Sequence, residues 1–155
     1  MSRPLATVLL LFIGCFSLPL SAQTADDEIQ LTRSVIQTER LAVVAANLGL
    51  SESEGAIFWP LYKEYRAARG ALLQERIDVI KMFVSGYETM DAKYARGLLD
   101  NMFEIDGKIL DVKREYAPRF DKILTPAQVV RLYQTENKLE VMMMAEVTKD
   151  VPLAR

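Results

Sequence analysis

Apolar residues recur every three or four positions along most of the chain after residue 26, and this spacing is typical of amphipathic helices. The longest such stretch covers residues 51–84. Its apolar positions are Phe58, Leu61, Tyr62, Tyr65, Leu72, Leu73, Ile77, Ile80, Phe83 and Val84. No segment alternates with the two-residue period of a strand, so the sequence predicts an all-α fold.

Helix-ending and helix-capping residues divide this pattern into four predicted helices. Asn47 and Gly49 end the first helix, and Thr89 is expected to cap the start of the third. The predicted ranges are 26–47, 51–84, 91–123 and 126–148. No domain linker or low-complexity run separates them, so we expect one domain.

The second and third helices are long and joined by a short connection, which predicts an antiparallel hairpin. With the turn near residue 88, Gly70 falls opposite Gly107. Glycine inside a helix costs about 1 kcal/mol relative to alanine, so a facing pair suggests a close approach of the two backbones. Pro60 likewise falls opposite Pro118, and we expect either a bend of the hairpin as a unit or two unrelated local kinks.

A second apolar row lies on the predicted third helix. Leu99, Phe103 and Leu110 lie roughly 120° around the helix from its main stripe. A helix in a simple hairpin needs only one buried stripe. The second row is therefore expected to be buried within the four-helix unit, to contact a second copy of the chain, or to bind a client protein.

Two short segments resemble one another. Leu50, Ser51 and Glu54 precede the second helix, and Leu124, Thr125 and Gln128 precede the fourth. Each segment has the form of a capping box, in which the hydroxyl accepts from the backbone N–H three residues later and the Glu or Gln side chain reaches back to the cap. Capping accounts for both motifs and by itself implies no function.

Charge and composition exclude several classes of function. The chain has 19 basic and 21 acidic residues, no histidine, and one cysteine, Cys15. The balanced charge favours neither nucleic acid nor an anionic membrane as a partner. A nucleophile needs an adjacent base, most often histidine, and zinc or copper(II) sites favour histidine and cysteine. We therefore expect a protein that is not an enzyme and has no catalytic residue, cofactor, metal site or small-molecule substrate.

The run Met142-Met143-Met144 is a candidate of a different kind. Thioethers suit Cu(I), but consecutive helical residues point about 100° apart and cannot converge on one ion. Methionine side chains re-pack easily and are used by promiscuous binding surfaces. Met142 and Met143 are accordingly interpreted as part of a client-binding or dimer surface.

Residues 1–22 have the pattern of a secretory signal peptide. Arg3 is followed by an apolar core from Leu5 to Leu18 and by small residues ending at Ala22. The core is shorter than the roughly 20 residues needed to span a bilayer. Cleavage after Ala22 leaves residues 23–155 as a single all-helical domain without cysteine, with a net charge of −3.

Two other interpretations of the first 22 residues stay open. The apolar core could be a buried helix or an uncleaved anchor. The segment ending at Cys15 also loosely matches a lipobox, which would make the protein a lipoprotein anchored at Cys15, although Phe12 fits the first position of that box poorly.

The repeated Leu-Ser/Thr-x-x-Glu/Gln motif, in a small exported all-helical chain, resembles the Spy/CpxP family of bacterial periplasmic stress proteins. The segment 124–128 matches the family motif fully, and 50–54 matches it with conservative changes. The sequence around residues 47–62 is similar to that of uncharacterised secreted proteins near that family. The resemblance implies an elongated, cradle-shaped homodimer in the periplasm. The slightly acidic net charge of this chain departs from the basic cradle of Spy-like members. The absence of His and Cys from the mature chain argues against metal sensing.

Two functions follow from this resemblance. The first is an ATP-independent chaperone that binds unfolded or stress-damaged client proteins on an apolar surface. The second is a signalling protein that modulates a membrane sensor in an envelope stress response.

Overall fold

The computed structural model describes residues 39–154. Residues 39–48 are helical and precede three longer helices, α2 (Glu52–Gly86), α3 (Ala92–Phe120) and α4 (Pro126–Thr148), with a short 3-10 helix, η1 (Tyr87–Thr89), between α2 and α3. No strand occurs within residues 39–154, so the predicted all-α fold is confirmed. The expected signal peptide and most of the predicted first helix lie outside the described residues.

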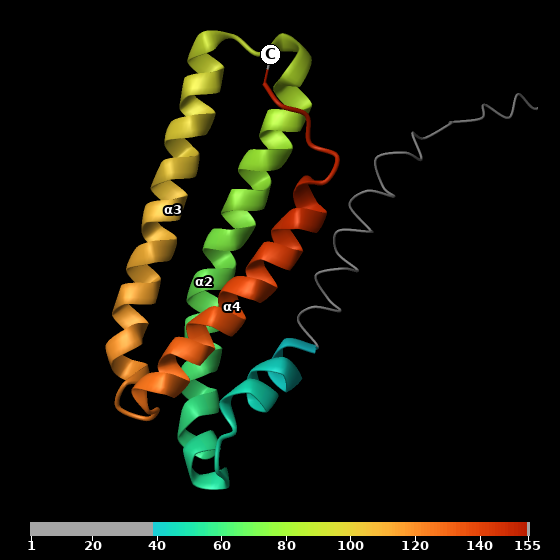
Figure 1. Ribbon diagram of the computed structural model, residues 1–155. Helices are drawn as coiled ribbons and strands as arrows, with labels where there is room; N and C mark the ends of the chain where they lie inside the picture. The colour runs from blue at the N-terminus through green and yellow to red at the C-terminus, as the bar shows by residue number, and fades with distance from the viewer. Residues whose placement is uncertain (1–38, 155) are drawn as a thin grey trace, which may run out of the picture.

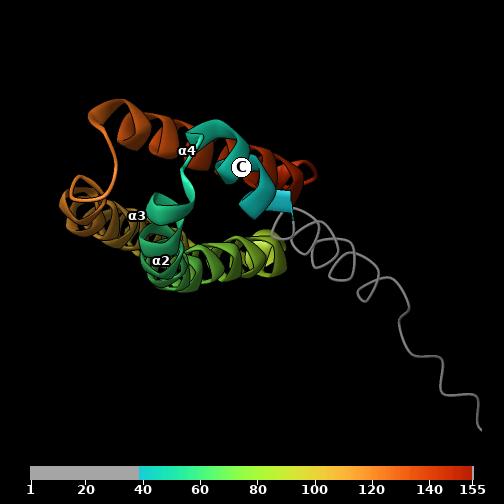
Figure 2. The ribbon, with the colours of Figure 1, turned by 90° about the horizontal axis from the view of Figure 1, so that it is seen from below.

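The helices form two layers. α2 and α3 run antiparallel as the predicted hairpin, and α4 crosses α2 obliquely (Figure 1). Seen along the hairpin, α2 and α3 make one layer, while α4 and the helix at residues 39–48 lie together in the other (Figure 2). Among the helices within residues 39–154, none packs over the full length of one face of α3.

Two predicted boundaries were wrong. The N-cap of α3 is Asp91, whose side chain accepts from the Tyr94 N–H at 2.7 Å, whereas Thr89 belongs to η1. α3 ends at Phe120 instead of continuing to Ile123. There the N–H groups of Ile123 and Leu124 both donate to the Phe120 carbonyl, which turns the chain towards α4.

The predicted close approach of Gly70 and Gly107 was also wrong. Apart from the chain neighbours and the backbone of the same helix turn, no described atom lies within 4 Å of the position that a Cβ would take at either glycine. Gly107 is exposed because it lies two residues from both Ile105 and Ile109, which are the buried positions of α3. At 100° per residue it therefore faces away from α2. Pro60 and Pro118 lie inside α2 and α3, and their joint bend stays a prediction.

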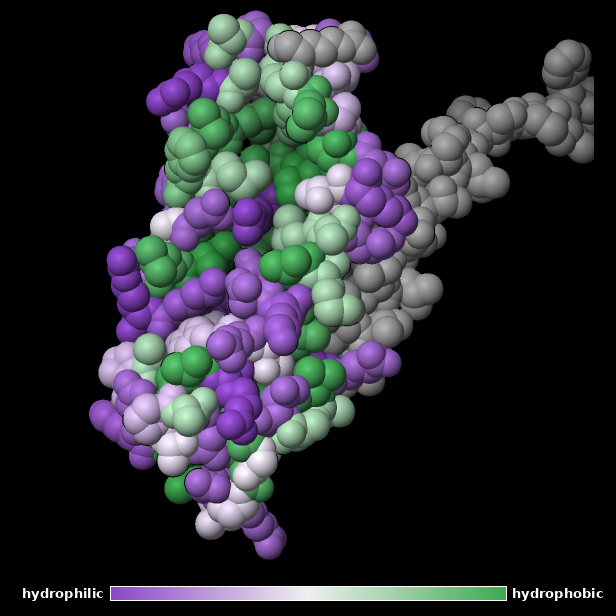
Figure 3. All heavy atoms as spheres, viewed as in Figure 1, coloured by the Kyte–Doolittle hydropathy of each residue, from purple (hydrophilic) through white to green (hydrophobic). Residues whose placement is uncertain are grey.

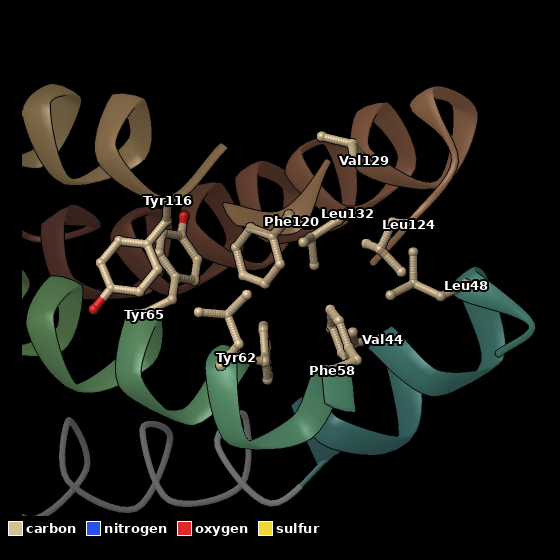
Figure 4. Close-up of a cluster of buried hydrophobic side chains, with 11 residues drawn as sticks. Val44, Leu48, Phe58, Tyr62, Tyr65, Tyr116, Phe120, Leu124, Val129 and Leu132 are labelled. Atoms are coloured by element: carbon tan, nitrogen blue, oxygen red, sulfur yellow. The ribbon is translucent and has the colours of Figure 1, made fainter. Parts of the chain in front are cut away.

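The part of the chain that the structure describes has two hydrophobic clusters, one at each end of the hairpin. The first joins residues 39–48 to the start of α2, the end of α3 and the start of α4, and it is rich in aromatic rings (Figure 4). The second joins the distal half of α2 to the first half of α3 and the end of α4. Its members are Leu73, Val79, Leu98, Ile105, Ile109 and Met143.

None of the helices within residues 39–154 combines the length and the apolar character that a membrane span needs.

Candidate functional site

An apolar groove of about 320 Å³ lies at the end of the hairpin where α2 turns into α3. Its walls come from α2, α3 and the residues that follow α4. The lining residues are Val79, Ile80, Phe83, Met90, Ala95, Leu98, Leu99, Met102, Thr148, Val151 and Ala154. Figure 3 shows apolar residues gathered in a hollow at this end of the molecule.

The side chains of the groove offer almost no polar recognition. Thr148 carries the only hydroxyl among them, and that hydroxyl donates to the Met144 carbonyl at 2.8 Å within α4. Sites for small molecules usually have several convergent polar groups that fix the orientation of the ligand. The groove therefore suits apolar side chains of a larger partner better than a polar metabolite.

The second apolar row of α3 is exposed. Leu99, Phe103 and Leu110 are 43 %, 61 % and 45 % exposed. They point within about 40° of one another around the helix axis. Leu99 also lines the groove, so the row starts at the groove and continues along α3. Burial inside the four-helix unit, one of the three alternatives for this row, does not occur in the described residues.

The methionine run divides between surface and core. Met142 is 63 % exposed, but Met143 is only 7 % exposed and belongs to the second hydrophobic cluster. Assigning Met143 to a client or dimer surface was therefore wrong. Successive residues of a helix point about 100° apart, so Met143 can face the core while the adjacent Met142 faces solvent.

Both predicted capping boxes are formed. Ser51 accepts from the Glu54 N–H, while the Ser51 N–H donates to Glu54 Oε2 at 2.8 Å. Thr125 and Gln128 repeat the arrangement, with the Thr125 N–H donating to Gln128 Oε1 at 2.9 Å. Leu124 is buried in the first hydrophobic cluster, and Leu50 packs against it. These six residues therefore order helix ends, which is a structural role.

The second box has an additional contact. Gln128 Nε2 donates to the Leu48 carbonyl at 3.2 Å, and Arg131 donates to the Asn47 carbonyl at 3.1 Å. The last carbonyls of a helix have no partner within it. The start of α4 therefore caps the end of the helix at residues 39–48, and the motif Leu124–Gln128 joins two helices as well as starting one.

A buried ion cluster was missed by the sequence analysis. Glu136 accepts from Arg40 at 2.7 Å, from Arg69 at 2.5 Å and from the Tyr62 hydroxyl at 2.5 Å. Arg69 also pairs with Glu140. Arg40, Arg69, Glu136 and Glu140 are all less than 9 % exposed. We call these four residues the ion cluster; it joins residues 39–48, α2 and α4.

Within the ion cluster two guanidinium groups face two carboxylates, and the partly exposed Arg76 and Lys113 also reach Glu140, at 3.6 and 3.8 Å. Isolated buried charges are costly, and pairing with hydrogen bonds offsets that cost. Burial alone lowers the pKa of Arg69, but its contacts with Tyr65, Glu140 and Glu136 raise that pKa above the ordinary value. Burial and the nearby Glu136 carboxylate raise the pKa of the Tyr62 hydroxyl. The buried, mutually paired side chains of the cluster give it a structural role.

One signal in the sequence pointed to this cluster. Arg69 lies four residues from both Tyr65 and Leu73, and Glu136 lies four residues after Leu132. Each charged residue therefore occupies a core position of its helix. The spacing identifies the residues as buried, but it does not identify their partners.

The described residues contain no group of three or more histidine, cysteine, aspartate or glutamate side chains that could hold a metal ion. Comparison with protein-family models, with curated proteins and with solved structures found no match. The candidate site is therefore defined by its geometry: an all-helical domain with an apolar groove that continues into an exposed apolar row.

Proposed function

We propose that this protein binds exposed apolar segments of other polypeptides and acts as an ATP-independent chaperone for unfolded or damaged clients outside the cytoplasm. The observation that carries the proposal is the continuity between the groove and the exposed row of α3, through Leu99. Contiguous apolar surface on a soluble domain is typical of sites that bind other proteins.

The methionine side chains that line the groove support a broad choice of clients. Met90 and Met102 line it, and unbranched thioether side chains adapt to partners of different shape. The groove lacks free polar side chains, so it would select for apolar character and not for one sequence. The slightly acidic chain favours neutral or basic clients over acidic ones.

Aggregation of heat-denatured citrate synthase, followed by light scattering without nucleotide, tests the proposal. We expect the wild-type domain to suppress scattering at near-stoichiometric amounts. The double variant Leu99→Ser/Phe103→Ser should lose most of this effect, since it removes apolar surface from groove and row together. Val130→Ser is the matched control, because Val130 is also exposed but lies at the start of α4, outside the groove.

The results separate the candidate functions. Absence of suppression at several-fold excess would contradict the chaperone. Recovery of one dominant membrane protein from cell envelopes, lost in the same double variant, would instead support the modulator of a membrane sensor. Sedimentation of the wild type and the double variant also tests the expected homodimer, since a dimer built on this row should dissociate when Leu99 and Phe103 become serine.

A further inference from the structure

Residues 151–154 run from the end of α4 to the turn between α2 and α3 without regular secondary structure (Figure 1). We call this segment the strap. Val151 and Ala154 line the groove. Leu153 is 89 % exposed, but its carbonyl accepts a hydrogen bond from the Tyr87 hydroxyl at 3.0 Å. The strap therefore contacts the groove through two apolar side chains and one main-chain hydrogen bond.

The sequence of the strap explains its extended form. Pro152 has no N–H, and a proline disfavours the helical conformation in the residue before it, here Val151. α4 consequently ends at Thr148, whose carbonyl accepts the Val151 N–H at 3.1 Å. Beyond that point the chain cannot continue as a helix and lies across the groove instead.

The contact between strap and groove is limited. Val151 is half-buried, and the other three residues of the strap are exposed. Ordering an extended segment costs conformational entropy at every residue. A single neutral hydrogen bond and one half-buried side chain, that of Val151, return a similar amount. The strap is therefore held weakly enough to leave the groove when a competing segment is present.

We propose that the strap is an internal substitute for the client: it closes one side of the groove in the free protein, and an extended apolar segment of a client displaces it. This inference rests on the proposed function for the identity of the competitor. The contacts of the strap define what the competitor needs, namely apolar side chains three residues apart and a backbone carbonyl between them that reaches Tyr87. The Tyr87 hydroxyl then serves as a donor for main-chain groups, which every polypeptide has.

A fluorescein-labelled peptide with the sequence of residues 148–154 is the probe, and its binding is measured by fluorescence anisotropy. We expect a chain that ends at Asp150 to bind this peptide about two-fold more tightly than the full chain, because a strap whose contacts roughly balance its ordering entropy covers the groove about half of the time. Introducing Tyr87→Phe into the shortened chain should weaken binding several-fold. That change keeps the ring, which packs on Phe83, and removes the hydroxyl that donates to the Leu153 carbonyl.

A pair of full-length variants covers the case in which the shortened chain does not fold. Val151→Asp/Ala154→Asp places charges against apolar walls and should release the strap, giving the same gain in peptide affinity. Leu153→Asp introduces a charge on the side chain that faces solvent, and it should bind the peptide as weakly as the wild type. Circular dichroism verifies that the variants keep their helical content.

Equal peptide affinity in the full chain, the shortened chain and the Val151→Asp/Ala154→Asp variant would overturn the strap as a competitor. The chaperone proposal would then still be tested separately, by the suppression of citrate synthase aggregation. Conversely, the shortened chain could bind the peptide more tightly without suppressing aggregation. That result would support the proposal for the strap and contradict the chaperone function. The two proposals therefore fail in different measurements.

Discussion

The Tyr62 hydroxyl on α2 donates to Glu136 Oε1 on α4 at 2.5 Å, and both residues are almost completely buried. Three residues further along α2, the buried hydroxyl of Tyr65 has no hydrogen-bond partner among the residues that the structure describes. Two neighbouring tyrosines in one hydrophobic cluster thus differ in whether their polar atom is satisfied.

The first prediction uses this contrast. Tyr62→Phe removes a hydrogen bond to a charged acceptor and should lower the free energy of unfolding by about 1.5–3 kcal/mol. Tyr65→Phe removes a desolvated, unpaired hydroxyl and should leave stability unchanged or raise it by about 1 kcal/mol. Urea denaturation followed by circular dichroism measures both. Equal losses in the two variants would show that the hydroxyls have equivalent partners.

The second prediction concerns the ion cluster. Glu136→Gln leaves Arg40 and Arg69 buried without their shared carboxylate, and such a loss typically costs about 3–5 kcal/mol. The control is Asp100→Asn, which breaks the exposed pair Arg96–Asp100 on α3 and should cost less than about 1 kcal/mol. Thermal and urea unfolding give both values. A loss in Glu136→Gln no larger than in the control would contradict a structural role for the cluster.

The third prediction isolates the second contact of the motif Leu124–Gln128. Gln128→Glu keeps an acceptor for the Thr125 N–H but cannot donate to the Leu48 carbonyl. We expect a loss of about 1 kcal/mol, with the helix at residues 39–48 affected most. Glu54→Gln is the matched control, since in the described residues Glu54 closes its box with Ser51 alone. Similar unfolding midpoints for the two variants would mean that the Gln128 contact with Leu48 contributes nothing.

The fourth prediction separates two adjacent methionines. Met143→Ala creates a cavity in the second hydrophobic cluster and should cost about 2–5 kcal/mol. Met142→Ala changes an exposed side chain and should stay within about 0.5 kcal/mol of the wild type. Thermal unfolding distinguishes them. If Met142→Ala is the more destabilising, the orientation of α4 described above is incorrect.

The fifth prediction concerns alkaline pH. Burial is the main cause that raises the pKa of Tyr133 to about 12, and it also raises the pKa values of Tyr62 and Tyr65. An unfolded tyrosine loses its proton near pH 10. Between about pH 10 and 12 the unfolded state therefore binds fewer protons than the folded state, and stability falls as pH rises.

Urea midpoints at about pH 9 and about pH 11, together with absorbance of tyrosinate at 295 nm, test this linkage. We expect the midpoint to fall over that interval and the buried tyrosines to ionise together with unfolding. In Tyr133→Phe the fall should be shallower. Full tyrosine ionisation in a protein that stays folded would contradict the burial of these hydroxyls.

Local periodicity was sufficient to predict the helices, because helix formation depends on residues three and four positions apart. The N-cap of α3 was misassigned because Thr89 and Asp91 are both suitable caps, and only the η1 turn decides between them. Met143 was misassigned because three identical adjacent residues do not by themselves show which of them faces the core. The partners in the ion cluster come from three separate segments, so no local pattern could identify them.

The ion cluster also has a mechanical consequence. Along α2 it lies between Tyr65 and Leu73, and along α4 between Leu132 and Met143, so it separates the two hydrophobic clusters. Paired charges accept only one alignment, whereas apolar contacts are non-directional and tolerate sliding. The cluster therefore fixes the register between α2 and α4. If the protein binds clients as proposed, we expect the methionine-rich end beyond the cluster to adapt to them and the aromatic end to keep its shape.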